Sequence, residues 1–347
     1  MEENHEKYMR RCIELARNGL GNVAPNPLVG AMIVHENRIV GEGFHVEYGK
    51  SHAEVNAINS VRDKHLLKKS TLYVNLEPCS HFGKTPPCSL LIAQNEIPRV
   101  VVGSLDSNPL VAGKGLDHLK NAGCKITIKV LEDECRELNK RFFTFQEKKR
   151  PYIILKWAQT LDGFIDVERK NNQTGPTWIT NESARALVHK WRSEEQSIMV
   201  GTNTVMIDNP RLNIRDWAGK HPTRVIIDRT LKLPDDAHVL DNSIRTIVYN
   251  GLKENDEGNI SYRKIPFDEN TLHHLFASLY QEKILSVMVE GGARLLGSLI
   301  EKGLYDEIRV FSGNVLFKRG LKAPLLPDAD FSHFEMGDYK LLISRKY

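Results

Sequence analysis

Hydrophobic and polar positions follow two alternating periods in the first part of the chain. Residues 5–19 (HEKYMRRCIELARNG) carry apolar side chains at helical spacing and end at a glycine, which predicts a helix. Residues 29–44 (VGAMIVHENRIVGEGF) predict a hairpin that turns near Glu36 and Asn37. Further along, the same periods predict a helix over 53–63, strands over 71–77 and 99–104, a helix over 113–122 and a strand over 125–130.

A charged run that ends in proline then interrupts the pattern. We expect a helix through about residue 141, followed by FQEKKRP at 145–151. Charge and proline are typical of the linkers that separate domains. The run therefore predicts a boundary between one domain over 1–146 and a second over 147–347.

Strands and helices alternate again in the second half. A strand over 152–160 leads into an Asp-Gly turn, and a helix over 181–196 has Thr180 or Asn181 as its N-cap. Strands are expected at 197–201, 223–228, 245–250, 284–290 and 306–311, helices at about 269–282 and 292–302, and a polar loop at 251–260. This alternation predicts an α/β fold with a largely parallel sheet in both halves.

Composition narrows the class of protein. A chain of 347 residues with 41% hydrophobic and 27% charged residues is typical of two soluble globular domains. The net charge of +4 is too small to indicate a nucleic-acid partner, although it suits small anionic substrates. No apolar run has the length of a membrane span, and the polar N-terminus lacks the hydrophobic segment of a signal peptide.

The cysteines indicate a reducing compartment, which we expect to be the cytoplasm. Five cysteines in a long chain without a signal peptide do not predict a disulfide framework. We expect Cys12, Cys124 and Cys135 to act as small buried hydrophobic residues. The other two lie close together in a polar, turn-rich run, where metal binding or catalysis is the better explanation.

Three residues form a candidate zinc site. SHAEVNA at 51–57 supplies His52, and LEPCSHFGKTPPC at 76–88 supplies Cys79 and Cys88. Catalytic zinc takes three protein ligands and keeps one position open for water, and thiolates suit this borderline-soft ion. If helices begin near His52 and Cys79, their N-termini would favour the anionic ligands.

Glu54, two residues after His52, would allow this site to catalyse hydrolysis. Zinc lowers the pKa of water toward neutrality, and a carboxylate beside it can move protons to a ring nitrogen and to leaving ammonia. The pattern H-x-E…P-C-x-x-C is typical of nucleobase deaminases, although eight residues separate the cysteines here rather than two. Two alternatives stay open: a helix-capping His52 beside unrelated core thiols, and a structural zinc site, which would need a fourth ligand and leaves Glu54 unexplained.

The second half lacks the G-x-G-x-x-G fingerprint of a dinucleotide-binding fold. Instead, ILSVMVEGGARLLGSL at 284–299 predicts a buried strand that runs through Gly291 and Gly292 directly into a helix. Glycines at that point let a phosphate approach the N–H groups of the helix. A tight turn without a ligand explains the same pattern.

At these motifs the sequence resembles a known family, the bifunctional RibD enzymes of bacterial riboflavin biosynthesis. The first half resembles their deaminase half in PNPLVG (25–30), GEGFH (41–45), HAE (52–54), EPCSHFGKTPPC (77–88) and NPLVAGKGLDHLKNAG (108–123). The second half resembles their reductase half in LKWAQTLDG (155–163), WIT (178–180), 191–215, RVIID (224–228) and VEGGARLLGSL (289–299), and less after about residue 313.

The resemblance implies a fold and a set of residues for each half. The fold would be α/β, with an N-terminal cytidine-deaminase-like α/β/α domain followed by a dihydrofolate-reductase-like α/β domain. Zinc would be bound at His52, Cys79 and Cys88, with Glu54 as proton shuttle and a pyrimidine carrying a ribose 5-phosphate as substrate. Asn26 and His45 would line this pocket, or be a turn asparagine and a surface histidine; Lys84 is a candidate phosphate partner or a solvated loop lysine.

For the reductase half, the resemblance implies hydride transfer from NADPH to C1′ of the sugar. The implied nucleotide-binding residues are Ala158, Trp178, Thr204, Asp208, Arg229, Gly292, Ala293, Arg294, Leu295, Leu296, Gly297 and Ser298. The implied substrate-binding residues are Arg192 and Arg215 at the phosphate, Pro176 and Leu212 along the wall, and Glu290 at the sugar hydroxyls. Each also has a purely structural explanation, for example Trp178 in the core and Glu290 at the N-terminus of the following helix. Lys156 or Asp162 would deliver the proton.

Two other functions compete with this one. A degenerate second half would bind without reducing, and a nucleic-acid editing enzyme would use that half to bind RNA. The editing function needs a basic stripe with stacking aromatics, which the nearly balanced charge does not provide. We therefore expect a small-molecule substrate, no nucleic-acid or membrane partner and, by resemblance, a homo-oligomer (a dimer or tetramer).

Overall fold

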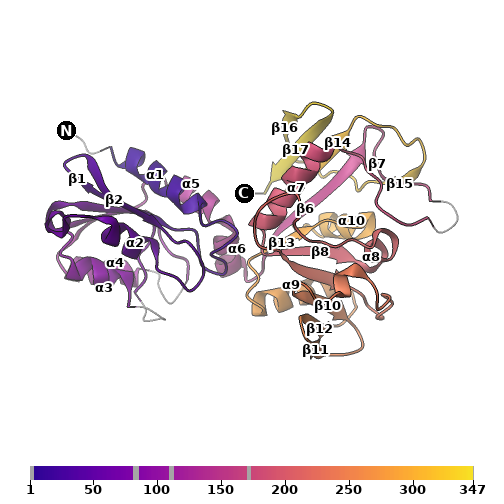
Figure 1. Ribbon diagram of the computed structural model, residues 1–347, viewed down its shortest axis with the longest axis horizontal. Coiled ribbons are helices and arrows are strands. Elements are labelled where there is room, and N and C mark those ends of the chain that lie inside the picture. The colour runs from indigo at the N-terminus through magenta and orange to yellow at the C-terminus, as the bar shows by residue number, and fades with distance from the viewer. Residues whose placement is uncertain (1–3, 81–85, 109–112, 170–172, 347) are drawn as a thin grey trace. The chain divides into compact units, whose positions relative to one another are not determined.

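The computed structural model describes residues 4–80, 86–108, 113–169 and 173–346. The chain forms two compact units, Met1–Lys149 (unit 1) and Arg150–Tyr347 (unit 2), each drawn in Figure 1. All five cysteines are free thiols. Among the described residues, no helix is both long enough and apolar enough to cross a membrane.

Unit 1 contains a five-stranded sheet in the order β2-β1-β3-β4-β5 (Figure 1). Its strands are β1 (Gly30–His35), β2 (Arg38–Phe44), β3 (Thr71–Leu76), β4 (Arg99–Ser104) and β5 (Lys125–Thr127). The expected hairpin is present, and Glu36 and Asn37 turn it with φ angles of 46° and 63°. Strand β1 pairs antiparallel with β2 and β3, whereas β3, β4 and β5 are parallel. The expectation of a largely parallel sheet was therefore only half right for this unit.

Helices cover both faces of this sheet because its central strands are buried on both sides. Ala31 and Ile33 of β1 pack with α2 (Ala53–Ser60), while Met32 and Val34 pack with α1 (His5–Arg17). The remaining helices are η1 (Lys64–Lys69), α3 (Cys88–Gln94), α4 (Lys114–Asn121), α5 (Glu132–Leu138) and α6 (Lys140–Lys148). Figure 1 shows α1 and α5 on one face of the sheet and α2, α3 and α4 on the other. The unit is a three-layer α/β/α sandwich.

Unit 2 is built on a ten-stranded sheet in the order β11-β12-β10-β9-β8-β13-β6-β14-β17-β16. Its strands are β6 (Tyr152–Thr160), β8 (Ser197–Gly201), β9 (Thr223–Ile227), β10 (Thr246–Asn250), β11 (Asn255–Glu257), β12 (Ile260–Lys264), β13 (Ser286–Val289), β14 (Glu307–Gly313), β16 (Ser332–Glu335) and β17 (Tyr339–Arg345). The run from β12 to β14 is parallel, and antiparallel strands close both edges. A separate two-stranded sheet joins β7 (Phe164–Val167) to β15 (Gly320–Lys322).

Helices also cover both faces of the sheet in unit 2 (Figure 1). Leu155 and Trp157 of β6 pack into the cluster that includes α9 (Thr271–Gln281) and α10 (Ala293–Glu301), while Ile154 packs with α7 (Glu182–Glu194). The side chain of Asn181 caps α7 by accepting from the amide of Ala184, so Asn181 rather than Thr180 is the N-cap. Helix α8 (Thr202–Asp208) and the short η2 (His238–Leu240) complete the unit.

Strand β13 sits between β8 and β6, although it follows both in sequence. The carboxyl ends of β6, β8 and β13 therefore meet where the strand order reverses. In open α/β sheets, this is where ligands bind.

Three expectations were wrong in detail. The polar segment 251–260 is not only loop, because it contains β11 and the first residue of β12. Helix α6 continues to Lys148, so most of the charged run expected to be a linker is helical. A helix was expected to begin near Cys79, but α3 begins at the second zinc-ligand cysteine, Cys88.

Candidate active sites

The side chains of His52, Cys79 and Cys88 converge in unit 1. His52 is the extended N-cap of α2, and Cys88 is the first residue of α3. Their ligand atoms lie within 4.8 Å of one another, with His52 Nδ1 at 3.3 Å from Cys88 Sγ and 3.6 Å from Cys79 Sγ. Zn–S and Zn–N bonds in a tetrahedral site imply N···S separations of about 3.6 Å. One nitrogen and two sulfurs at this spacing therefore fit a zinc ion.

The thiols are already polarised toward metal binding. A hydrogen bond from the Cys88 thiol, helped by His52 and by the amide of Cys88, lowers the pKa of Cys79 to about 4. The same shared proton and burial raise the pKa of Cys88. The surroundings of Cys79 thus favour its thiolate, and a divalent cation would deprotonate Cys88 as it binds.

Glu54 lies beside this cluster without being one of its three ligands. The residue is 3% exposed, because it lies on the inner face of α2, two residues after His52. Burial and the negative charge of Cys79 raise its pKa to about 7. A carboxyl group that titrates near neutrality is suited to accept and return a proton.

Asn26 and His45 form a short chain that leads to the zinc cluster. Asn26 Nδ2 lies 3.1 Å from His45 Nε2, and His45 Nδ1 lies 3.0 Å from the carbonyl oxygen of Ser51. The His45 ring meets the His52 ring edge-on, with 5.4 Å between centroids. His45 is buried, which lowers its pKa, so the alternative of a surface histidine is wrong, whereas its role in the pocket stays a prediction. Lys84 lies outside the described residues.

Glu77 supports the same site and was not predicted from the sequence. Its carboxylate accepts backbone N–H groups of Asp106, Gly113 and Gly115 at 3.1–3.3 Å. A Cβ at Gly115 would lie 2.1 Å from the carbonyl oxygen of Pro78, so only glycine allows this approach. The glutamate that precedes Pro-Cys in the motif was the available signal.

The second site is a cavity of about 1290 Å³ in unit 2. It lies at the carboxyl ends of the strands that meet at the switch in strand order. Of the residues expected here, most line it: Lys156, Ala158, Pro176, Trp178, Arg192, Thr204, Asp208, Leu212, Arg215, Arg229, Glu290, Gly292, Ala293, Arg294, Leu295 and Ser298. Three do not: Gly297, Asp162, and Leu296, whose side chain is fully buried in the core.

A buried ion-pair cluster forms the floor of the cavity. Both carboxylate oxygens of Glu290 accept from Arg192, from Nε and Nη2, each at 2.8 Å. Lys156 Nζ lies 3.7 Å from the same carboxylate. Burial alone would raise the pKa of Glu290, but Arg192 and Lys156 outweigh it and lower the pKa to about 2. Glu290 therefore remains an anion throughout the physiological range.

The two glycines after β13 bring the helix start to the cavity. A Cβ at Gly291 would lie 2.9 Å from Thr204 Oγ1 and from Val200 Cγ1, so a side chain would displace α8. Gly292 has a φ of 69°, in the left-handed region that glycine favours. The N-terminus of α10 thus opens on the cavity, where its free N–H groups suit a phosphate.

The structure separates the two candidate proton donors. Asp162 is outside the cavity, where Thr160 Oγ1 and the amides of Phe317 and Lys318 donate to it and lower its pKa. Lys156 lines the cavity, and its burial lowers the pKa of its ammonium group. Only Lys156 is placed to reach a ligand.

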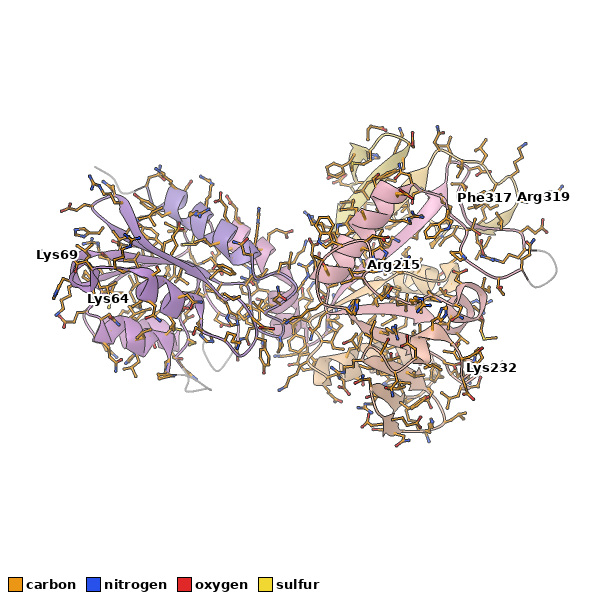
Figure 2. All side chains as sticks on the ribbon, viewed as in Figure 1. Lys64, Lys69, Arg215, Lys232, Phe317 and Arg319 are labelled. Carbon is orange, nitrogen blue, oxygen red and sulfur yellow. The ribbon has the colours of Figure 1, made fainter. Side chains whose placement is uncertain are left out.

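Several lining residues escaped prediction. Arg169 binds Asp166 and Asp208 at 2.7 and 3.2 Å, and burial raises the pKa of Asp208 to about 6. His189 of α7 lies one turn before Arg192 and is buried against Arg215, which Figure 2 labels. The contacts of Arg169 with Asp208 and of His189 with Arg215 span 39 and 26 residues of sequence, so no local pattern indicates them.

Known proteins resemble this chain over nearly its whole length. Residues 151–335 match the RibD C-terminal domain, and residues 2–104 match the cytidine and deoxycytidylate deaminase zinc-binding region. Riboflavin biosynthesis protein RibD of Aquifex aeolicus is 40% identical over 92% of this chain and 90% of its own. The corresponding Bacillus amyloliquefaciens protein is 40% identical over 94% and 89%. The crystal structure of a diaminohydroxyphosphoribosylaminopyrimidine deaminase/5-amino-6-(5-phosphoribosylamino)uracil reductase from Thermotoga maritima, 36% identical, superposes with a TM-score of 0.87 over 98% of both chains.

Proposed function

The chain belongs to the RibD family of riboflavin biosynthesis proteins, and on this basis we propose how its residues carry out the family's two reactions. It is a bifunctional enzyme with a zinc-dependent deaminase of cytidine-deaminase-like fold and a nicotinamide-dependent reductase of dihydrofolate-reductase-like fold. The first substrate would be diaminohydroxyphosphoribosylaminopyrimidine, and the second its deaminated product, 5-amino-6-(5-phosphoribosylamino)uracil.

In unit 1, His52, Cys79 and Cys88 would hold zinc, and Glu54 would move protons. When bound, zinc supplies a polarised water as the nucleophile that attacks the ring carbon bearing the amine. Glu54 would carry two protons in turn at its carboxylate: one from the attacking water to the ring nitrogen, and one from the added hydroxyl to the amine, which leaves as ammonia. Burial of this carboxyl group, which raises its pKa, supports its role as a proton carrier. Asn26 would read the base edge while His45 orients it.

In unit 2, the cavity would hold the nicotinamide cofactor and the ribosyl phosphate side by side. The cofactor, when bound, supplies hydride to C1′ of the opened sugar. Arg192 and Arg215 would bind the phosphate, for which guanidinium donors are suited. The permanent negative charge of Glu290 suits contacts with sugar hydroxyls, and Lys156 would provide the proton.

We propose NADPH rather than NADH as the reductant. Asp228, which ends the β9 region, is buried and accepts from Thr202 Oγ1 and the amide of Leu233, so it is not presented to a ribose hydroxyl. The next residue, Arg229, is exposed and lines the cavity. Its guanidinium lies over the Phe267 ring, 5.8 Å from the centroid, and a guanidinium at this point is suited to a 2′-phosphate.

One observation carries the whole proposal: unit 1 contains a His/Cys/Cys cluster beside a buried glutamate, and unit 2 contains a cavity lined by an ion-pair cluster. A degenerate second half would have lost this cluster, yet Lys156, Arg192 and Glu290 are all in contact. Cytoplasmic location and a dimeric or tetrameric state remain predictions from the sequence.

A coupled assay with a Glu54→Ala control tests the proposal. Purified protein, zinc, the diaminopyrimidine ribosyl phosphate and NADPH should give ammonia and a loss of NADPH absorbance together. The variant should give neither signal, and deaminated intermediate should restore NADPH loss. Ammonia release without NADPH consumption by the wild type would show that unit 2 is not the proposed reductase.

A further inference from the structure

His189 is a buried histidine in the wall of the reductase cavity to which the mechanism above gives no part. It lies on α7, one turn before Arg192, and its side chain is 3% exposed. The backbone N–H of Arg215 donates to its Nδ1 at 3.2 Å. An N–H group can only donate, so Nδ1 carries no proton and the ring is the neutral Nε2–H tautomer.

Burial and two neighbouring guanidinium groups keep His189 neutral, against the opposite effect of two carboxylates. Arg192 of α7 and Arg215 of the adjacent loop are positive, while Asp216 and Glu290 are negative, with Asp216 Oδ2 at 3.5 Å from Nε2. Burial, followed by the two guanidinium groups, lowers the pKa of His189 to about 4. Nδ1 of the ring therefore remains an acceptor at neutral pH.

Helix α7 holds the Arg215 loop at two points. Arg192 Nη1 donates to the carbonyl oxygen of Asn213 at 3.0 Å, and His189 accepts the amide of Arg215 itself. The guanidinium of Arg215 is exposed, and within the part of the chain that the structure describes its one hydrogen bond is to Asn213 Oδ1, at 3.3 Å. Its own side-chain contacts therefore fix it weakly. The position of this guanidinium relative to Arg192 depends on its backbone.

We propose that His189 is the positioning residue that holds Arg215 opposite Arg192, so that both guanidinium groups meet the phosphate of the reductase substrate. The inference rests on the function proposed for unit 2. It assigns His189 a part in binding the phosphorylated substrate, not in the hydride step.

The chain offers a matched control in the same loop. His221 Nδ1 accepts the amide of Ile214 at 3.2 Å, which is the same kind of bond one residue earlier. His221 is exposed and does not line the cavity. Loss of its bond tests the effect of loosening the loop without touching the Arg215 amide.

The test compares four variants in the full-length chain. His189→Asn places an amide oxygen where Nδ1 was, whereas His189→Gln places its amide near the position of Nε2. His189→Ala removes both atoms, and His221→Ala is the control. Steady-state reduction is followed with 5-amino-6-(5-phosphoribosylamino)uracil and with the same nucleoside lacking phosphate. Scanning calorimetry of the full chain reports whether each variant keeps the transition of unit 2 that NADPH raises.

The Ala and Gln variants of His189 should raise KM for the phosphorylated substrate by up to about tenfold at unchanged kcat, the usual effect of losing one hydrogen bond. In His189→Asn and His221→Ala, KM for the phosphorylated substrate should remain within about twofold of the wild-type value. KM for the unphosphorylated nucleoside should be the same in wild type and in all four variants. The proposal would be overturned if His189→Gln, and not His189→Asn, kept the wild-type KM. It would also be overturned by an equal rise in KM for the unphosphorylated nucleoside, or by a fall in kcat with KM unchanged. Calorimetric binding of the phosphorylated substrate to wild type separates the two hypotheses: no binding refutes the function proposed for unit 2, whereas equal binding by wild type and His189→Ala refutes only the role of His189.

Discussion

Replacing Glu290 by alanine tests the buried charge cluster of the reductase site. The substitution would leave Arg192 and Lys156 as two buried cations without the carboxylate that both contact, at 2.8 and 3.7 Å. Removing one partner of a buried ion pair typically costs about 3–5 kcal/mol, because the remaining charge is desolvated and unpaired. For a unit of this size the loss corresponds to a melting temperature lowered by about 6–20 °C.

Scanning calorimetry of the full chain measures this loss. The transition of unit 2 is the one that NADPH raises, since a ligand stabilises the folded state to which it binds. That transition should fall in Glu290→Ala, and NADPH oxidation should disappear, while ammonia release from unit 1 persists. Glu257→Ala is the matched control, because its partner Lys253 lies at a similar distance of 3.0 Å but both side chains are exposed. The control should leave the transition where it is.

The stabilisation that Glu290 provides should decrease as the pH falls. The folded pKa of Glu290, about 2, lies below its unfolded value, so its contribution to stability is present above about pH 4.5 and is lost as the pH falls toward 2. The stability difference between wild type and Glu290→Ala should therefore shrink across that window. A difference of under about 2 °C in melting temperature at neutral pH, with NADPH oxidation retained, would show that the cluster is neither desolvated nor required.

Two further substitutions probe the same cavity. Arg229→Ala should raise KM for NADPH about 10- to 100-fold, the value of charge-assisted hydrogen bonds, and leave KM for NADH unchanged. Equal changes in KM for the two cofactors would contradict the proposed contact between Arg229 and the 2′-phosphate. Lys156→Met should lower kcat for reduction about 10²- to 10⁴-fold while NADPH still binds, as fluorescence titration can show, and an unchanged kcat would exclude Lys156 as proton donor.

The sequence predicted most clearly the features that short segments determine. The strands of the parallel sheet are continuous apolar runs, and β6 and β8 begin and end where the pattern places them. The three zinc-ligand candidates were found because few other roles suit a histidine and two cysteines in polar surroundings. Helix α8 was missed because TNTVMID is short and contains several β-branched residues, and only its place after β8 makes it helical.

Contacts between distant segments could not be predicted in this way. Glu290 was expected either at sugar hydroxyls or at the start of the following helix, and no local pattern indicated Arg192, which lies 98 residues earlier. The contact between His189 and Arg215 depends on the path of the loop after α8. Burial also changes a residue's chemistry without changing its sequence context, as His45 illustrates.

The two buried glutamates show how the surrounding charge determines the role of a carboxylate. Burial raises the pKa of Glu54, and the nearby thiolate of Cys79 raises it further, to about 7 in the metal-free site. Glu290 is equally enclosed, but two cations hold its pKa near 2. Glu54 can therefore exchange a proton during the reaction, whereas Glu290 cannot donate one at any pH at which the enzyme works. The proton that reduction requires must come from another group, and among the two candidates only Lys156, which lines the cavity and whose pKa burial lowers, is placed to supply it.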